Sequence, residues 1–250
     1  PSEKIAALTG DMTNMETMFA LKEFFEKTIR SENLDSRVDN LYVNTSDREN
    51  YLLNSSIEGI EDSDLIILIG ANPRFEATML NSRIRKAYLN NNTDIFCLGD
   101  IGDLNYPYEV LDNSTKTIKD IVNHTHRISE KIHNSKKPIF LIGQSALKLK
   151  SSPFLFEELK KYLIKNNIIN DNWNALNILS NDASTVGSNY LNIFSSNDGT
   201  NKTIDKISNN QIDVLFLFGQ ENLKINKKNE FIIYVGSHGD KGANLADIIL

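Results

Sequence analysis

The stretch Leu65-Ile66-Ile67-Leu68-Ile69-Gly70-Ala71-Asn72-Pro73-Arg74 decides the fold class. Five consecutive branched apolar residues with no polar interruption are typical of a strand buried on both faces, as in a parallel sheet. Gly70 permits a sharp turn out of that strand, and Asn72 with Pro73 is a favourable start for a helix. The stretch therefore predicts a strand, a tight turn and a helix in succession.

The same pattern recurs along the chain. Short apolar runs that stop at a glycine occur at Ile5–Gly10, Ile95–Gly99, Ile139–Gly143, Val214–Gly219 and Phe231–Gly236, and Ala175–Leu179 is a weaker further run. Helical spacing of apolar residues follows several of them, for example Met15, Met18, Phe19, Phe25 and Ile29, then Ala77, Leu80, Ile84 and Tyr88, then Leu155, Leu159, Leu163 and Ile164. Thr13-Asn14, just before the first of these helical patterns, is expected to provide its N-cap. Alternating strands and amphipathic helices predict a doubly wound α/β fold with mostly parallel sheets flanked by helices.

Two segments break the alternation of strands and helices, and a third stretch suggests a boundary between two halves of the chain. Asp100–Ser114 and the Ser-, Asn- and Gly-rich Ser180–Lys202 are expected to be loops. The polar stretch Asn134–Pro138 suggests two similar α/β halves, residues 1–134 and 135–250.

Composition excludes several classes of function. The 250 residues carry 27 Lys and Arg against 33 Asp and Glu, a net charge of −6, which disfavours broad binding of a phosphate backbone; the basic spot at Arg83, Arg85 and Lys86 is read as a solvated helix face. No apolar run reaches the roughly 18 residues of a membrane span. The single cysteine, Cys97, cannot hold an iron–sulfur cluster alone and is expected to be a small buried hydrophobe.

Candidate ligand-binding turns follow the strands, because open α/β sheets bind ligands at the carboxyl ends of their strands. Helix-start amides and Arg74 in Gly70–Arg74 could hold a phosphate, although the turn is read by preference as a helix start alone. Glycines at 236, 239 and 242 do not form a dinucleotide fingerprint, and no Walker motif occurs. In Gly143-Gln144-Ser145-Ala146-Leu147, Leu147 replaces the small residue that a nucleophile elbow needs.

The histidines offer little for metal binding. His124 and His126 are two residues apart, a spacing that would put them on different sides of a helix, and His133 lies near a polar turn. His238 follows a predicted strand, where a loop-fixing hydrogen bond is the preferred reading. We therefore expect no catalytic, cofactor-binding or metal-binding residue in this chain.

Read together, the turns resemble a known family. The matching segments, in order, are Gly10-Asp11-Met12, Ser31-Glu32-Asn33-Leu34-Asp35, Tyr51-Leu52-Leu53-Asn54-Ser55, Gly59-Ile60-Glu61, Gly70-Ala71-Asn72-Pro73-Arg74, Leu80-Asn81-Ser82-Arg83-Ile84-Arg85-Lys86, Trp173-Asn174-Ala175-Leu176-Asn177, Ala183-Ser184-x-Val186-Gly187 and His238-Gly239-Asp240-Lys241-Gly242-Ala243. They resemble the large iron–sulfur subunit of respiratory NADH:quinone oxidoreductase (complex I), which is known as the 75-kDa subunit in mitochondria and has a bacterial counterpart. The resemblance lies in its carboxyl-terminal, molybdopterin-oxidoreductase-like part.

The resemblance implies a structural, cofactor-free part of the peripheral arm, itself not catalytic. Gly70–Arg74 would be a relic of a pterin-nucleotide turn. The iron–sulfur clusters are expected in an amino-terminal region or in a partner chain, since the chain looks like a segment of a longer subunit or half of a split one. Partners would be other peripheral-arm subunits, with no nucleic acid and no direct membrane insertion, on the matrix side of the mitochondrial inner membrane or the cytoplasmic side of a bacterial plasma membrane.

Two other functions remain open from the sequence. The first is a fragment of a molybdopterin-dependent oxidoreductase that retains its cofactor, although Cys97 is badly placed as its metal ligand. The second is a free-standing nucleotide-binding module.

Overall fold

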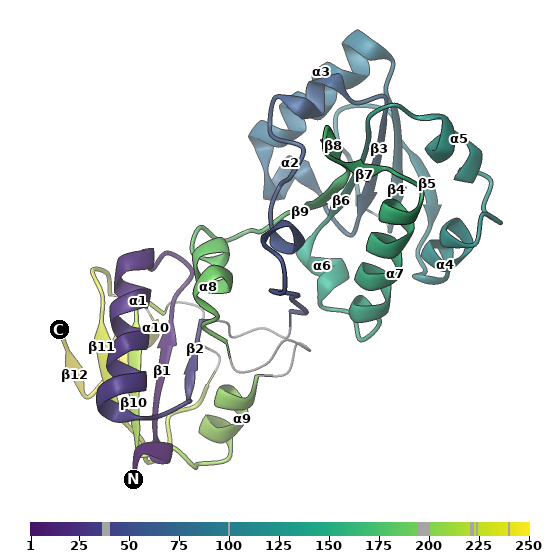
Figure 1. The fold of residues 1–250 in the computed structure, drawn as a ribbon. Helices are drawn as coiled ribbons and strands as arrows, with labels where there is room; N and C mark the ends of the chain where they lie inside the picture. The colour runs from purple at the N-terminus through teal and green to yellow at the C-terminus, as the bar shows by residue number, and fades with distance from the viewer. Residues whose placement is uncertain (37–40, 100, 195–200, 221–222, 224, 240) are drawn as a thin grey trace. The chain divides into compact units, whose positions relative to one another are not determined.

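A computed structural model of the chain describes residues 1–36, 41–99, 101–194, 201–220, 223, 225–239 and 241–250. The chain forms two compact units (Figure 1). Unit 1 consists of residues 1–45 and 182–250, and unit 2 of residues 46–181. The expected division at 134/135 is thus replaced by an insertion of one unit into the other.

The sheet of unit 1 has five parallel strands in the order β12-β11-β10-β1-β2. The strands are β1 (Ile5–Thr9), β2 (Leu34–Asp35), β10 (Val214–Phe218), β11 (Phe231–Val235) and β12 (Ile248–Ile249). Its helices are η1 (Ser2–Lys4), α1 (Met15–Phe24), the π-helical turn η2 (Phe25–Ile29), α8 (Thr185–Leu191), α9 (Lys202–Ser208) and α10 (Lys241–Leu245). The predicted cap of α1 is confirmed, because the Asn14 side chain accepts the Thr17 N–H.

The sheet of unit 2 has five parallel strands in the order β5-β4-β3-β6-β9. They are β3 (Leu65–Ile69), β4 (Asp94–Leu98), β5 (Glu109–Asp112), β6 (Pro138–Ile142) and β9 (Leu176–Ile178), and β7 (Ile169–Asn170) pairs with β8 (Trp173–Asn174) in a hairpin. The helices are η3 (Arg48–Tyr51), η4 (Gly59–Asp62), α2 (Pro73–Glu76), α3 (Thr78–Asn91), α4 (Lys116–Val122), α5 (Ser129–Asn134), α6 (Gln144–Leu147) and α7 (Ser152–Lys165). The doubly wound, parallel fold class is confirmed.

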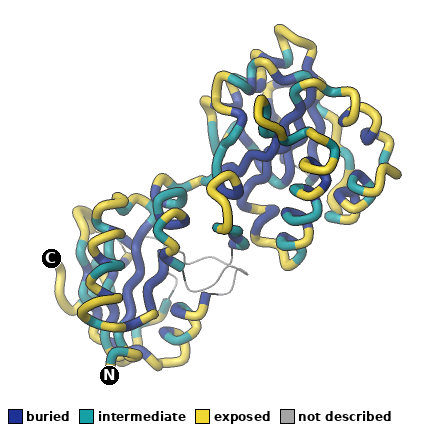
Figure 2. Tube along the Cα trace, viewed as in Figure 1, coloured by how far each residue is buried: buried dark blue, intermediate teal, exposed yellow. Residues whose placement is uncertain are grey.

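Burial differs between the strands of the two sheets (Figure 2). In unit 2 every residue of β3 and β6 is buried, so both faces of these strands are covered. Their apolar cluster includes Ile66, Leu68 and Cys97. In unit 1, β10 and β11 alternate between buried residues and residues that are more exposed.

Three expectations about connections need correction. The stretch Asn134–Pro138 only joins the last residue of α5 to the first residue of β6, and β6 pairs with β3 inside the sheet of unit 2. The expected loop Asp100–Ser114 contains β5, although Asp100 lies outside the described residues. The expected loop Ser180–Lys202 contains α8, which forms because it packs on α1: a side chain at Gly187 would meet Met18. Residues 195–200 of that loop are likewise outside the described part.

Candidate functional site

Each sheet has one topological switch point, the place where the strand order reverses direction beside the first strand of the unit. It lies between β3 and β6 in unit 2 and between β1 and β10 in unit 1. The turns that leave these strands at their carboxyl ends include most of the candidate turns found in the sequence. In doubly wound sheets these places are where ligands bind.

The switch point of unit 2 is filled by the protein's own turns. Gly70 ends β3 with φ +57°, and a Cβ built on Gly143 would lie only 2.4 Å from the Gly70 carbonyl oxygen. The Ser145 hydroxyl donates a hydrogen bond to that same carbonyl. The Ser145 hydroxyl, which lies in the incomplete nucleophile-elbow sequence, is therefore hydrogen-bonded to the turn after β3.

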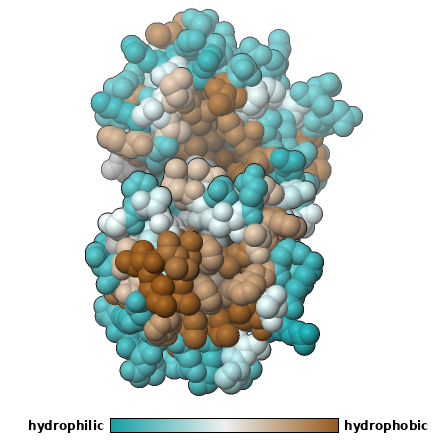
Figure 3. Space-filling view, turned by 90° about the vertical axis from the view of Figure 1, so that its left-hand side faces the viewer, coloured by the Kyte–Doolittle hydropathy of each residue, from teal (hydrophilic) through white to brown (hydrophobic). Residues whose placement is uncertain are grey.

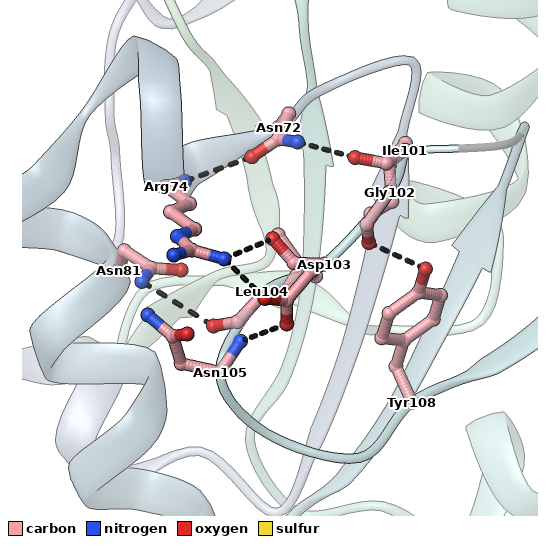
Figure 4. A network of polar contacts seen from close by, with 9 residues as sticks. All are labelled: Asn72, Arg74, Asn81, Ile101, Gly102, Asp103, Leu104, Asn105 and Tyr108. Carbon is pink, nitrogen blue, oxygen red and sulfur yellow. Dashed lines mark hydrogen bonds and ion pairs between the residues drawn. The ribbon is translucent and has the colours of Figure 1, made fainter.

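The anion-binding groups of Gly70–Arg74 have internal partners (Figure 4). The Arg74 N–H donates to Asn72 Oδ1 at 3.0 Å, which caps α2. The Asn72 N–H donates to Glu76 Oε1 at 2.6 Å, so a carboxylate of the chain occupies the position that an external anion would need. Asn72 Nδ2 donates to the Ile101 carbonyl. The structure thus favours the reading of Asn72 and Pro73 as a helix start.

Arg74, the cation of this turn, pairs with Asp103 from the β4–β5 connection (Figure 4). The Asn105 N–H also donates to this carboxylate at 2.9 Å. These two hydrogen bonds, the backbone bond first, hold the pKa of Asp103 below its usual value. At neutral pH the ionised Asp103 carboxylate therefore balances the positive charge of the Arg74 guanidinium.

The β4–β5 connection is fixed to α3 and to itself beside this ion pair. Tyr106 donates its hydroxyl to Asn81 Oδ1 at 2.9 Å, and Asn81 Nδ2 is 3.4 Å from the Leu104 carbonyl. Tyr108 donates to the Gly102 carbonyl at 2.6 Å. Burial, and to a smaller extent the nearby Cys97, raises the pKa of Tyr106, which keeps the phenol neutral.

The switch point of unit 1 is filled in the same way. A Cβ on Gly10 would lie 1.6 Å from the Gly219 carbonyl oxygen, so the two turns touch through their backbones. Thr13 donates its hydroxyl to the Phe218 carbonyl at 2.9 Å, and Ser184 donates to the Gly10 carbonyl at 3.2 Å. Gly10-Asp11-Met12 therefore begins a turn that is packed against its neighbours.

One polar atom at each switch point has no hydrogen-bond partner within the described part of the chain. These atoms are Gln144 Nε2 in unit 2 and Thr9 Oγ1 in unit 1, and both residues are buried. Sequence reasoning considered Gln144 only as a neighbour of Ser145, and it passed over Thr9 as the end of a strand. Their burial depends on how closely the glycine turns approach, which no local sequence pattern encodes.

The remaining candidates lie apart from the switch points or in ordinary structural roles. Cys97 is fully buried in the core of unit 2, and burial raises the pKa of its thiol well above the usual range. The thiol therefore stays neutral and packs as a small hydrophobic side chain. His124 and His126 lie in the turn after α4, and His133 lies in α5. Across the described residues, no group of three or more His, Cys, Asp and Glu side chains could hold a metal ion.

Two further polar features have partners. His238 Nδ1 lies 2.9 Å from the Ser237 hydroxyl, and the His238 carbonyl accepts the Tyr234 hydroxyl at 3.2 Å, as expected for a loop-fixing residue; Asp240 beside it is outside the described residues. In the basic spot of α3, Arg83 and Lys86 both pair with Glu61. Hydrogen bonding to Arg83 is the main cause that holds the pKa of Glu61 below its usual value.

These features define a doubly wound α/β protein in which two glycine turns approach each other closely at each switch point. All 250 residues match the molybdopterin oxidoreductase family, and the chain belongs to that family.

The resemblance to the large subunit of complex I is confirmed by individual relatives. The chain is 36% identical over 264 residues to the NADH-ubiquinone oxidoreductase 75 kDa subunit of Reclinomonas americana, covering 100% of this chain and 38% of that protein. It is 34% identical to the corresponding NADH-quinone oxidoreductase subunit of Rickettsia bellii, over 99% of this chain and 35% of that one. It is 29% identical to the NADH dehydrogenase [ubiquinone] iron-sulfur protein 1 of Solanum tuberosum, over 99% and 33%. The chain therefore spans about a third of the length of these relatives.

Proposed function

We propose that this chain is a structural, cofactor-free part of the peripheral arm of NADH:ubiquinone oxidoreductase. Its role is to support the domain that carries the iron–sulfur clusters and to assist assembly. The names of its relatives, which are subunits of that complex, support the complex. The structural role rests on the geometry of this chain.

The observation that carries the proposal is the internal bonding of the Gly70–Arg74 turn. Three groups there that could bind a nucleotide phosphate have partners in the chain: Asn72 N–H has Glu76, Arg74 N–H has Asn72, and the Arg74 guanidinium has Asp103. A phosphate would have to displace a carboxylate from a backbone amide and another from the guanidinium. The residues present therefore do not fit a pterin nucleotide at this turn.

The chemistry of the side chains points the same way. A single buried cysteine with a raised thiol pKa is a poor ligand, because metals bind the thiolate. Electron transfer is accordingly assigned to clusters held by another region or chain.

The proposed partners are the other peripheral-arm subunits, the cluster-bearing domain first among them. The proposed location is the matrix side of the inner mitochondrial membrane, or the cytoplasmic side of a bacterial plasma membrane. None of the described helices is both long enough and apolar enough to cross a bilayer.

One alternative keeps a specific observation in its favour. The match to the molybdopterin oxidoreductase family extends over the whole chain, and Gln144 Nε2 is a buried donor without a partner in the described part. Both would suit a fragment that retains a molybdopterin cofactor. Metal content separates this alternative from the structural role.

The proposal is tested by following the chain in its own membranes. On a native gel of mildly solubilised membranes, the chain is expected to migrate with the NADH dehydrogenase activity. Depletion of the chain should reduce the amount of assembled complex, and the purified chain should oxidise no NADH. Migration away from that activity would contradict the proposal.

A matched variant tests the role of the turn itself. Arg74→Ala removes only an ion pair at a partly exposed site, so the assembled complex should keep its NADH oxidation. Full assembly with lost activity would instead indicate that Arg74 binds a reacting group.

A further inference from the structure

The sheet of unit 1 has one face that is less covered than the other. On β10 and β11, residues 215, 217, 232 and 234 are buried, whereas Val214, Phe216, Phe218, Phe231, Ile233 and Val235 are half-buried or exposed. Strands in the middle of a parallel sheet normally need cover on both faces, as β3 and β6 of unit 2 have. We call these six residues, with Ile248 of β12, the open face.

Exposure on this face rises from the centre of the sheet toward the β12 edge. The parallel register aligns Ala7, Phe216, Ile233 and Ile248 in one row. Ala7 is fully buried, Phe216 and Ile233 are half-buried, and Ile248 is 44% exposed. In the next row Ile5 and Val214 are half-buried, and Phe231 is 44% exposed. The cover is therefore lost progressively over β11 and β12.

Helix α1, η2 and the end of α8 provide the cover that exists on this face. Met18 and Leu21 of α1, Phe25 of η2 and Ile193 after α8 form a cluster with Ala7, with Phe216 and Phe218 at its margin. The Phe25 and Phe216 rings meet edge to face, with their centroids 6.1 Å apart. Among the described residues, no residue of β11 or β12 belongs to this cluster, whereas Ile232 and Tyr234 on the opposite face pack with residues of α9 and α10.

Figure 3 shows the side of unit 1 on which β11 and β12 lie in Figure 1, and hydrophobic residues gather there in the lower part of the view. Strands about 4.8 Å apart make this strip about 10 Å wide across β10, β11 and β12, close to the diameter of one α-helix. Along β10 and β11, which have five residues each, it is about 17 Å long, the length of about 11 helical residues, and β12 adds two residues at its edge. The strip therefore has the dimensions of a single helix lying beside α1.

The net charge of unit 1 indicates which charge the polar side of that helix carries. Unit 1 contains 11 Lys and Arg against 16 Asp and Glu, a net charge of −5, whereas unit 2 contains 16 against 17, a net charge of −1. Nearly all of the net negative charge, −5 of −6, is thus on the unit that carries the open face. A positively charged partner would be attracted to this unit, and a negatively charged one would be repelled.

We propose that the open face binds an amphipathic α-helix of a partner polypeptide, with an apolar stripe on β10–β12 and a Lys- or Arg-rich outer side. This inference rests on the packing of unit 1 and not on the role proposed above. The helix takes the place of the second covering helix on that side of the sheet.

The test uses the full chain and three synthetic peptides of about 14 residues. The first is a helix with a Leu stripe and Lys on its polar side, the second carries Glu in place of Lys, and the third has a central proline that breaks the helix. Binding is measured by fluorescence anisotropy. Amide hydrogen exchange then locates the site.

The Lys peptide is expected to bind and to slow exchange in Phe231–Val235, and the other two peptides to bind at least about tenfold more weakly. Ile248→Lys at the exposed edge and Ile233→Lys in the centre should each weaken binding by a similar factor, because they place a charge in the apolar contact. Leu89→Lys, at a 63% exposed position on α3 of unit 2, is the matched control and should leave binding unchanged. Unchanged thermal unfolding of Ile248→Lys shows that this variant folds.

Four results would overturn the proposal. Three come from the peptides: failure of the Lys peptide to bind, equal binding of the Glu or proline peptide, and binding that Ile248→Lys does not weaken. Sedimentation that shows dimerisation of the chain alone, abolished by Ile248→Lys, would also overturn it, because a second copy would then cover the open face.

Discussion

Asp64 shows how one side chain joins distant parts of unit 2. It lies just before β3, and its carboxylate accepts the Lys136 N–H at 2.8 Å, the Lys137 N–H at 3.0 Å and the Ser135 hydroxyl. Burial alone would raise the pKa of this carboxyl, but these hydrogen bonds outweigh burial and hold the pKa below its usual value. Asp64 therefore fixes the turn that leads into β6.

Asp64→Ala should lower the free energy of unfolding of unit 2 by about 1 kcal/mol at pH 7, a modest value because the carboxylate is partly exposed to solvent. A folded-state pKa below the unfolded value means that the stabilisation is present above about pH 4 and is lost as the pH falls through the folded-state pKa. The difference between the variant and the unchanged chain should therefore shrink in acid.

Urea unfolding followed by the fluorescence of Trp173, the single tryptophan of the sequence, measures this effect in unit 2. Asp62→Ala is the control, because it removes a surface pair with Lys137 and should change stability by less than about 0.5 kcal/mol. An Asp64→Ala effect no larger than the control, or one that grows in acid, would contradict the assigned role.

Sequence reasoning succeeded at single residues where the determinant was local. Asn72 and Pro73 start a helix, Asn14 caps α1, and Cys97 is buried, all for reasons visible within a few neighbouring residues. It did not supply the Asp103 partner of Arg74. That partner is 29 residues away and depends on the path of the β4–β5 connection.

At the scale of elements, all six glycine-terminated runs form parallel strands, and Ala175–Leu179 contains β9. Continuous apolar runs identify such strands because both faces must be covered. The short edge strands β2, β5 and β12 were not predicted, because edge strands need no long apolar run: β2 and β5 contain polar residues, and β12 has only two residues. Helix α8 was missed because its packing on α1 overrides a composition that favours turns.

The close approach of the β3 and β6 turns can be tested at Gly143. Gly143→Ala places a Cβ 2.4 Å from the Gly70 carbonyl oxygen and 2.8 Å from Ala71, so the turns must separate. We expect the free energy of unfolding of unit 2 to fall by about 3 kcal/mol, as for other overpacked sites.

Gly239→Ala is the matched control, because its Cβ would meet no atom within 4 Å among the described residues. Thermal unfolding of the two variants should differ clearly. Equal stability would show that the two turns are free to separate and that the crevice is not held closed.

At the scale of the whole molecule, unit 2 is a continuous segment inserted into unit 1. Sequence reasoning expected two consecutive halves, because it followed the chain and treated the polar α5–β6 connection as a linker. Parallel sheets are assembled from strands that are far apart in sequence, so β10 and β11 join β1 across the whole insertion. The local composition of the sequence does not predict that pairing.

Both units of the molecule share one feature that bears on function. At each switch point a pair of glycines brings two turns into backbone contact, Gly10 with Gly219 and Gly70 with Gly143. In unit 2 the groups of the Gly70–Arg74 turn that could bind a phosphate are also paired within the chain, with Glu76, Asn72 and Asp103. This pairing supports the proposal that the chain provides packing and support and that redox chemistry belongs to its partners.

Metal analysis tests this assignment most directly. The chain is purified alone and, separately, within the complex that accompanies it, and molybdenum, tungsten and iron are measured by mass spectrometry against the protein concentration. We predict none of the three metals in stoichiometric amount in the isolated chain, and no molybdenum or tungsten in the complex. One molybdenum or tungsten per chain, or iron bound stoichiometrically by the isolated chain, would contradict this prediction.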